Sequence, residues 1–464
     1  MRSERGGALL FALDGRRLRL SVVGSGIRQA LRLIADKGAA ESKLADVVLE
    51  VDGAAALPRM YYCLHSLQAF GAVSYVLRQG SRMLARLSPA AGSSWMTLPA
   101  VMPDKQYRLS RFAYLRRDDE CLALQSPSSG AELELRDGRA LVMIAALARP
   151  RTVRDLAVAA VGTDLATART FVSLLAGAGM LDDAERGAGD WSFADFVFHA
   201  STREGRRHPT EPRESRGRQG SPPAIKPAMS AAVIQLERPD VKALQLRDVP
   251  FTRVLASRRS LRSYGVLPLS ASKLGEFLFR VARVKRVSSS RQREGARQLT
   301  RRPYPSGGSR YGLELYAIIG ACRDIPRGMY HYDPLGHRLE ALAAPEADVD
   351  GLLRRAAAAA GRSAEPQVLI VIAARFRRVT WKYRSMAYPL VLKEVGGLYQ
   401  TMYLVATAMK LAPCALGGGD PGRFARLIGT DFFEETSVGE FLLGSRPTRR
   451  EGPSLRAAGR RGSG

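Results

Sequence analysis

The sequence predicts an α+β protein built from two dissimilar parts. Within the first 185 residues, a segment with helical periodicity occurs twice at a constant offset of 108 residues. After residue 247, helical segments alternate with apolar segments typical of strands. A polar stretch rich in Gly, Pro, Ser and Arg separates the two parts. We therefore expect small helical domains at the amino terminus and one larger α+β domain after them.

The first copy of the repeat predicts a winged-helix-like domain over residues 1–100. The segment "ALRLIADKGAAESKLADVV" (30–48) is typical of two helices joined by a turn. A third helix, "LPRMYYCLHSLQAF" (57–70), is expected to end at Gly71, since glycine adopts the left-handed conformation that terminates helices. The following "AVSYVLRQGSRMLARLSP" (72–89) reads as two strands around a Gln-Gly turn, which would form the wing.

The second copy predicts a similar domain over residues 101–185. Its "ALVMIAALARPRTVRDLAV" (140–158) again reads as two helices around a turn. The helix in "LATARTFVSLLAGAG" (165–179) carries apolar residues at the same relative positions as the first copy and ends at Gly179. Two tandem winged-helix-like domains are the natural interpretation.

The net charge of +27 raises the possibility of nucleic-acid binding, because Lys and Arg neutralise phosphates. Much of this charge lies in three runs, 202–227, 283–302 and 445–464, of which the first and last have linker-like and tail-like compositions. We expect a linker over 186–244 and a basic disordered tail over 447–464.

The expected recognition helices also disfavour nucleic acid. "MYYCLHSLQAF" and "ARTFVSLLAG" contain few of the basic and amide side chains that read bases in the major groove. Winged-helix units can instead bind a peptide as an added strand, held by main-chain hydrogen bonds. We therefore expect this half of the protein to bind a peptide.

The larger domain is expected over residues 245–446. Clear strands are predicted at 313–321, 367–375 and 437–444. The segment 388–411 predicts a long helix whose apolar stripe would pack in the core. This stripe consists of Leu392, Val395, Tyr399, Met402, Val405 and Met409, and the helix also carries Gly396 and Gly397, which permit close packing. Lys393, Glu394 and Gln400 interrupt it, so a membrane span is not expected.

The remaining composition indicates a cytoplasmic protein. The start of the chain has too short an apolar stretch for a signal peptide. The four cysteines are far apart, and the five histidines do not cluster with them, so neither a metal site nor a disulfide framework is expected.

Two short motifs in the larger domain are compatible with a bound ligand, but taken alone they are also typical of an exposed basic helix start and an ordinary loop. "RRSLR" (258–262) gathers three arginines and a serine within five residues, a set of donors that can hold a phosphate. "RPYPSGG" (302–308) places glycines just before an apolar strand, where backbone can closely approach a flat or charged group.

These motifs occur in order with "RGMYHYDPLGHRLEAL", "WKYRSMAY" and "VGEFLLG". Together they resemble the flavin-dependent azoline dehydrogenases, the SagB type within the nitroreductase superfamily, which make thiazole and oxazole rings in ribosomal peptides. The resemblance covers about residues 245–446 well. It extends more loosely over the amino-terminal repeats, which are similar to peptide-clamp winged helices, and over "FADFVFHASTREGR".

The resemblance implies a homodimer with an FMN site that both chains complete. Its implied cofactor residues are an arginine-rich phosphate segment, a serine turn beside the isoalloxazine ring, glycine amides near the reactive nitrogen and an arginine after the last strand. They are Arg258, Arg259, Ser260, Arg262, Pro305, Ser306, Gly307, Gly308, Leu416, Gly417, Gly418 and Arg446. The helix at 388–411 would then lie at the dimer interface.

The resemblance also implies that Lys382 and Tyr383, in "WKYRSMAY", serve azoline oxidation, with the lysine as a general base. The implied partners are an azoline-containing precursor peptide and a YcaO-type cyclodehydratase. Two alternatives stay open: a generic NAD(P)H-dependent flavin nitroreductase, for which the sequence has no GxGxxG fingerprint, and a winged-helix regulator that binds nucleic acid.

Overall fold

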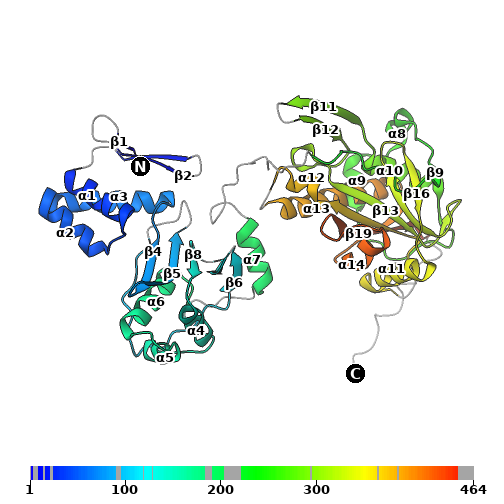
Figure 1. The fold of residues 1–464 in the computed structure, drawn as a ribbon. Coiled ribbons are helices and arrows are strands. Elements are labelled where there is room, and N and C mark those ends of the chain that lie inside the picture. Colours follow the sequence, from blue (N-terminus) through cyan, green and yellow to red (C-terminus); the bar gives the residue numbers. More distant parts are fainter. Residues whose placement is uncertain are drawn as a thin grey trace, which may run out of the picture. The chain divides into compact units, whose positions relative to one another are not determined.

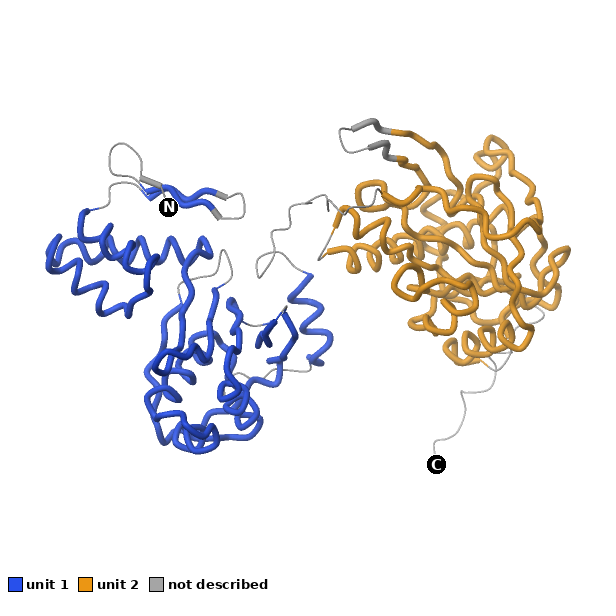
Figure 2. The backbone as a smooth tube through the Cα atoms, in the orientation of Figure 1, with its two compact units in different colours: residues 1–210 blue, residues 211–464 orange. Residues whose placement is uncertain are grey.

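The computed structural model divides the chain into two compact units, residues 1–210 and residues 211–464 (Figure 2). Each unit has its own hydrophobic core. The structure describes residues 2–3, 9–13, 16–20, 24–89, 96–118, 120–127, 129–182, 191–202, 221–292, 295–362, 365–383 and 386–447. The predicted basic tail lies outside the described residues from residue 448 onward.

Three helices and a small antiparallel sheet open the first unit (Figure 1). The helix α3 ends at Gly71, whose φ of 82° is the left-handed conformation expected for it. Apolar side chains of all three helices, among them Ile27, Val48 and Met60, form one core. The elements are β1 (Arg2–Ser3), β2 (Leu9–Leu13), β3 (Arg16–Leu20), α1 (Ser25–Asp36), α2 (Glu41–Asp52), η1 (Ala54–Ala56) and α3 (Leu57–Phe70).

The predicted wing forms, but it joins the second half of the unit. The strands β4 (Tyr75–Gln79) and β5 (Arg82–Pro89) turn at Gly80, whose φ is 60°. β5 then pairs antiparallel with β8 (Ala131–Leu135) in a sheet of order β4-β5-β8-β7-β6, completed by β7 (Cys121–Gln125) and β6 (Tyr114–Asp118). The two repeats therefore share one sheet across the predicted boundary at residue 100.

The second copy supplies α4 (Gly138–Ala146), α5 (Val153–Ala159) and α6 (Leu165–Gly177). Thr152 and Asp155 form a capping box at the start of α5, which satisfies the first backbone donors of that helix. The helix α6 is followed by Gly179 with φ of 65°. Beyond it, Leu181 makes an isolated bridge with Leu109, and residues 183–190 are outside the described part of the chain.

The predicted linker, 186–244, contains ordered elements. They are α7 (Phe193–Thr202), β9 (Val233–Gln235) and α8 (Val241–Arg247). β9 pairs with β16 (Arg338–Leu342) at the edge of the large sheet, so the second unit begins before residue 245. The division of the chain into five parts stays a prediction. The pairing of β5 with β8 crosses its boundary at residue 100, and the pairing of β9 with β16 places part of the predicted linker in the large sheet.

A seven-stranded sheet of order β18-β19-β17-β13-β15-β16-β9 forms the centre of the second unit, with every neighbouring pair antiparallel. The three predicted strands are confirmed and lie side by side as β13, β17 and β19. The strands are β13 (Leu313–Ile319), β15 (Gly328–Asp333), β17 (Val368–Arg375), β18 (Leu411–Leu416) and β19 (Glu435–Ser445), in addition to β9 and β16.

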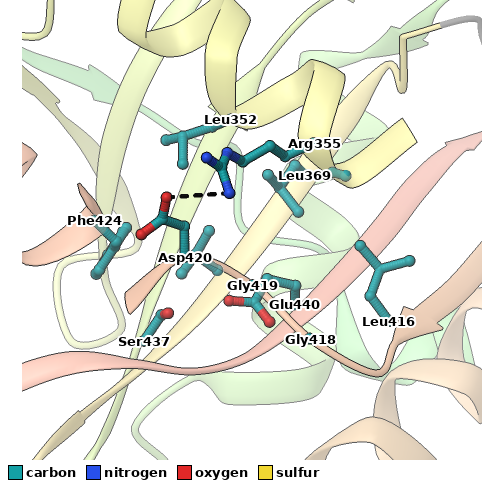
Figure 3. Close-up of a pocket in the computed structure, with 12 residues that line it drawn as sticks. Leu352, Arg355, Leu369, Leu416, Gly418, Gly419, Asp420, Phe424, Ser437 and Glu440 are labelled. Carbon is teal, nitrogen blue, oxygen red and sulfur yellow. Dashed lines mark ion pairs between the residues drawn. The ribbon is translucent and has the colours of Figure 1, made fainter. Parts of the chain in front are cut away.

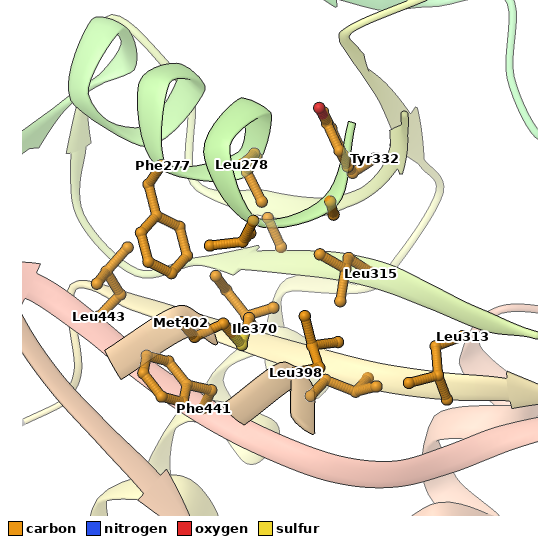
Figure 4. Close-up of a cluster of buried hydrophobic side chains, with 14 of the residues drawn as sticks. Phe277, Leu278, Leu313, Leu315, Tyr332, Ile370, Leu398, Met402, Phe441 and Leu443 are labelled. Carbon is orange, nitrogen blue, oxygen red and sulfur yellow. The ribbon is translucent and has the colours of Figure 1, made fainter. Parts of the chain in front are cut away.

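Helices cover both faces of this sheet. On one face, α10 (Ala271–Ala282) and α13 (Ala387–Ala408) bury Phe277 and Met402 against strand residues such as Ile370 (Figure 4). On the other face lie α11 (Glu346–Ala359) and α14 (Pro421–Leu427). The shorter elements are α9 (Phe251–Ser257), β10 (Leu269–Ser270), β11 (Arg286–Gln292), β12 (Gly295–Arg301), η2 (Gly307–Ser309), β14 (Cys322–Arg323) and α12 (Phe376–Thr380).

The long predicted helix is confirmed as α13, but its buried stripe differs from the predicted one. Val391, Val395, Leu398, Met402 and Ala406 are buried, whereas Leu392 is 38% exposed. The observed stripe also includes Glu394, a buried carboxyl among apolar neighbours.

Two further sequence features have simple structural outcomes. The basic run at 283–302 forms the antiparallel hairpin β11–β12, with Arg286 opposite Arg301. In the described part of the chain, no helix is both long and apolar enough to cross a membrane.

Candidate functional site

The serine turn predicted to lie beside a flavin is anchored to α13. The Ser306 hydroxyl donates to Glu394 Oε1 at 3.0 Å and accepts a hydrogen bond from the Tyr311 amide at 2.8 Å. The Gly307 amide donates to the same Glu394 oxygen at 2.8 Å. Gly397, one turn along α13, has no side chain, and a Cβ there would lie 3.1 Å from Pro305. The turn is therefore fixed by one buried carboxyl and one glycine of the helix.

Glu394 is only 5% exposed, and burial raises its pKa although Gly307 and Ser306 both donate to it. Its second oxygen, Oε2, is buried and has no hydrogen-bond partner among the described residues. An ionised oxygen without a donor is costly in the interior, which accounts for the upward direction of this shift in pKa.

Lys382 and Tyr383 lie at Gly308. Both follow α12, and their amides donate to the Val379 carbonyl at 3.1 and 2.9 Å. A Cβ on Gly308 would lie 2.8 Å from Lys382 Nζ and 2.9 Å from Tyr383 Oη. Gly308 also has φ of 56°, a backbone conformation that glycine adopts without strain. The turn and the lysine-tyrosine pair, predicted separately, thus form one cluster.

The arginine segment lies at the other end of α13. Arg258, Arg259 and Arg262 are exposed. The Arg258 guanidinium lies 5.2 Å from the centre of the Tyr403 ring, and the Ser260 and Tyr403 hydroxyls are 2.7 Å apart. Tyr403, which the sequence analysis did not single out, therefore orders the segment while leaving the guanidinium groups open to a ligand.

Tyr403 also connects this segment to the predicted glycine amides. Its hydroxyl accepts a hydrogen bond from the Ala415 amide at 2.8 Å, immediately before Leu416. Gly417 and Gly418 are exposed, and a Cβ on either would meet no atom within 4 Å. Their backbone is open to a ligand at close range.

Arg446 follows β19 and lies near the arginine segment through its backbone. The Gly265 amide donates to the Ser445 carbonyl at 3.1 Å, and a Cβ on Gly265 would lie 3.1 Å from the Arg446 carbonyl oxygen. The Arg446 side chain is exposed.

The predicted cofactor residues thus form two groups. The serine turn contacts Glu394, whereas the arginine segment and Ala415 contact Tyr403. Glu394 and Tyr403 are nine positions apart on α13 and so about 13 Å apart along its axis.

A small pocket of about 40 Å³ lies beside Gly418 and Gly419, on the face covered by α11 and α14 (Figure 3). The buried carboxyl of Glu440 lies directly against Gly419, where a Cβ would overlap it. Burial raises the pKa of Glu440. The pocket mouth carries an ion pair of Arg355 and Asp420 at 3.3 Å. Of the predicted residues, only Leu416 and Gly418 line this pocket.

Glu394, Tyr403 and Glu440 contact the candidate site, and sequence reasoning gave none of them a role there. Glu394 interrupts an apolar helix, which was a usable signal, because a carboxyl on a buried stripe needs a partner. Tyr403 and Glu440 carried no such signal, since their partners come from segments distant in the sequence.

Three family models match the chain in succession. The ThcOx helix-turn-helix domain matches residues 4–97, the cyanobactin oxidase ThcOx matches residues 107–208, and the nitroreductase family matches residues 255–444. These matches confirm the predicted order of a helix-turn-helix region followed by a nitroreductase domain.

Three relatives match parts of the chain. A Methanocaldococcus jannaschii protein named as a nitroreductase is 28% identical over 184 residues, 40% of this chain and 84% of the relative. The microcin B17-processing protein McbC of Escherichia coli is 30% identical over 140 residues, 28% of this chain and 49% of McbC. The trifolitoxin-processing protein TfxB of Rhizobium leguminosarum is 26% identical over 148 residues, 31% of this chain and 35% of TfxB.

Proposed function

We propose that this chain, an oxidoreductase with a nitroreductase-family domain behind ThcOx-type regions, oxidises thiazolines or oxazolines in a ribosomally made peptide to thiazoles or oxazoles. The observation that carries the proposal is the position of Lys382 and Tyr383 over Gly308. A reductase of small molecules has no evident need for this pair. The matches to McbC and TfxB, which are named for processing microcin B17 and trifolitoxin, support the same substrate class.

The residues present fit FMN as the cofactor. The exposed guanidinium groups of Arg258, Arg259 and Arg262 suit a phosphate, which prefers charge-assisted and bidentate donors. Gly417 and Gly418 leave open space at their backbone, where a flat ring could approach. Bound FMN would supply the oxidant that accepts a hydride from the substrate ring.

The chain's own residues would handle the proton. The α proton of an azoline is acidified by the ring imine and the adjacent carbonyl, and Lys382 Nζ would take it as general base. Tyr383 lies beside it, with Lys382 Nζ 5.3 Å from the centre of the Tyr383 ring, and would orient the lysine or the substrate. Glu394 would keep the turn below them in place.

A homodimer would unite the two groups of cofactor residues. Because they lie about 13 Å apart along α13 in one chain, the serine turn of one copy could complete the site of its partner. The exposed Leu392 on α13 supports an interface on this helix.

The first unit would hold the precursor peptide. Its sheet offers β4 and β6 as edge strands, which can accept a peptide as an added strand. A YcaO-type cyclodehydratase would supply the azoline substrate, and we place the reaction in the cytoplasm, where precursor peptides are made.

The test is oxidation of an azoline-containing peptide by the purified protein, with extraction of its flavin. We expect bound FMN and a mass loss of one hydrogen molecule for each ring oxidised. A protein that retains FMN and reduces nitroaromatics with NAD(P)H, but leaves azolines unchanged, would instead be a generic nitroreductase.

A further inference from the structure

The chain enters the second unit through a segment, residues 221–229, that we call the strap. It is held by buried polar contacts. Lys226 Nζ pairs with Glu435 Oε2 at 2.6 Å and donates to the Tyr316 hydroxyl at 2.7 Å. Ala224 is fully buried. The strap is therefore an integral part of this unit, although its composition predicted a linker.

Two buried arginines donate hydrogen bonds to the first two residues of the strap. Arg310 and Arg378 are 2% and 0% exposed. Arg310 Nε donates to the Arg378 carbonyl at 3.0 Å, and Arg378 Nη2 donates to the Arg310 carbonyl at 2.7 Å. Arg310 Nη2 also donates to Ser221 Oγ at 2.6 Å, and Arg378 Nη1 donates to the Pro222 carbonyl at 2.6 Å. We call these four residues the arginine clamp.

The clamp joins the two segments that form the lysine-tyrosine cluster. Arg310 directly follows η2, which contains Gly308. Arg378 lies in α12, one helical turn before Lys382. The Arg310 guanidinium also stacks on Trp381, 4.7 Å from the ring centre. Movement of the clamp would therefore reach both the turn and the pair above it.

The energetics suggest that the clamp imposes a position. Burial, and then the nearby Arg310 charge, lower the pKa of Arg378. Two buried like charges are costly unless acceptors surround them, and apolar replacements of buried charged groups are often neutral or stabilising. Ser221 and Pro222 provide such acceptors. Because apolar side chains could fill this site without the cost of burying two charges, the arginines are not needed for stability alone. Their hydrogen bonds do, however, hold the neighbouring segments in defined positions.

We propose that the strap is a positioning element of the active site: Ser221 and Pro222 complete the arginine clamp, which holds Lys382 and Tyr383 over Gly308. The chain that connects the two units thus takes part in building the catalytic geometry. Only the kinetic consequence of this proposal rests on the proposed function. The position of the segment 381–383, which we call the loop, can be measured separately.

The test uses the full chain with Trp95→Phe and Trp191→Phe, so that Trp381 is the remaining tryptophan of the three. Ser221→Ala removes the hydroxyl that Arg310 contacts, and Ser221→Thr restores a hydroxyl. Ser230→Ala is the matched control, since Ser230 lies just beyond the strap and its hydroxyl accepts a hydrogen bond from the nearby Ala232 amide. We measure Trp381 emission without substrate, and kcat and KM on an azoline peptide.

We expect Ser221→Ala to shift Trp381 emission and to lower kcat by roughly 10- to 100-fold with KM little changed, because misplacement affects the chemical step. Ser221→Thr should recover both readouts, and Ser230→Ala should match the parent. Arg378→Met should reproduce the Ser221→Ala effects more strongly. If Arg378→Met does not fold, the serine variants still decide.

Parent-like emission and kcat in Ser221→Ala would overturn the proposal. A fall in kcat without a shift of Trp381 emission would also overturn it, since the loop would then not have moved. If the parent does not oxidise azolines, the proposed function fails, while Trp381 emission still decides whether the strap positions the loop.

Discussion

Lys382 is the residue whose replacement tests the proposed chemistry most directly. Its side chain is half-buried, and its amino group lies against Gly308 and beside Tyr383. We expect Lys382→Ala to keep the fold and bound FMN but to lose about 100- to 10,000-fold in azoline oxidation, because a positioned proton-transfer group is removed. Tyr383→Phe should lose less. Oxidation at the parent rate by an FMN-loaded Lys382→Ala variant would contradict the assignment.

We expect Glu394 to make a contribution to the free energy of unfolding that depends on pH. Its pKa in the folded protein is raised above the ordinary 4.5, so the folded state keeps a proton that the unfolded state loses. Its contribution is therefore complete below pH 4.5 and declines as the pH rises through the raised folded pKa. Glu394→Gln keeps an oxygen that can accept from Ser306 and Gly307, and it does not titrate.

The difference in unfolding free energy between the parent and Glu394→Gln isolates this group. We expect the parent to lose stability relative to the variant as the pH rises above 4.5. Urea unfolding of the second unit, followed by Trp381 fluorescence in chains that carry Trp95→Phe and Trp191→Phe, measures this difference over a series of pH values. A difference that stays constant with pH would show that Glu394 has an ordinary pKa.

At the scale of elements, the serine turn should be sensitive at Gly308 and tolerant at Gly307. Alanine at Gly308 must adopt a φ near 56°, which costs about 1 kcal/mol, and its Cβ displaces Lys382 and Tyr383. We expect Gly308→Ala to lower azoline oxidation far more than that small loss of stability would explain. A Cβ at Gly307 meets Glu394 Oε1 at an ordinary 3.5 Å, so Gly307→Ala is the control. Equal effects of the two variants would refute this account.

The helix α13 organises the site because its residues contact every predicted cofactor segment except Arg446. Glu394 and Gly397 hold the serine turn, while Tyr399 and Tyr403 bind the strand ends near Leu416. The same helix buries an apolar stripe in the core. Because core packing holds α13 in place, the residues that contact it in both groups are held in place as well.

At the scale of the whole molecule, the first unit should bind peptide in preference to nucleic acid. The helices α3 and α6 each carry a single arginine and no lysine, and α3 exposes Tyr61 and Tyr62. We expect the full chain to bind a labelled precursor peptide more tightly than a labelled duplex at physiological salt. Any duplex binding should weaken steeply with added salt, because it would depend on the net charge of +27. Tight duplex binding that resists salt, without peptide binding, would reverse the assignment.

The sequence by itself determined the order of domain types, the three central strands and the residues of the lysine-tyrosine and arginine motifs. These depend on local periodicity and on short motifs, which do not require knowledge of distant neighbours. The helix ends at Gly71 and Gly179 were predictable for the same reason, since both have the left-handed φ that their sequence context predicts.

Only the tertiary structure decided which of these parts meet. The sharing of one sheet by the two repeats arises from the pairing of β5 with β8, whose partners are distant in the sequence. Ser221 reads as part of a polar linker, yet it contacts Arg310, 89 positions away. Glu394 reads as an interruption of an apolar helix, yet it holds the serine turn, 88 positions away. Hydrogen bonds between such segments form only after the chain has folded, so residue order alone does not reveal them.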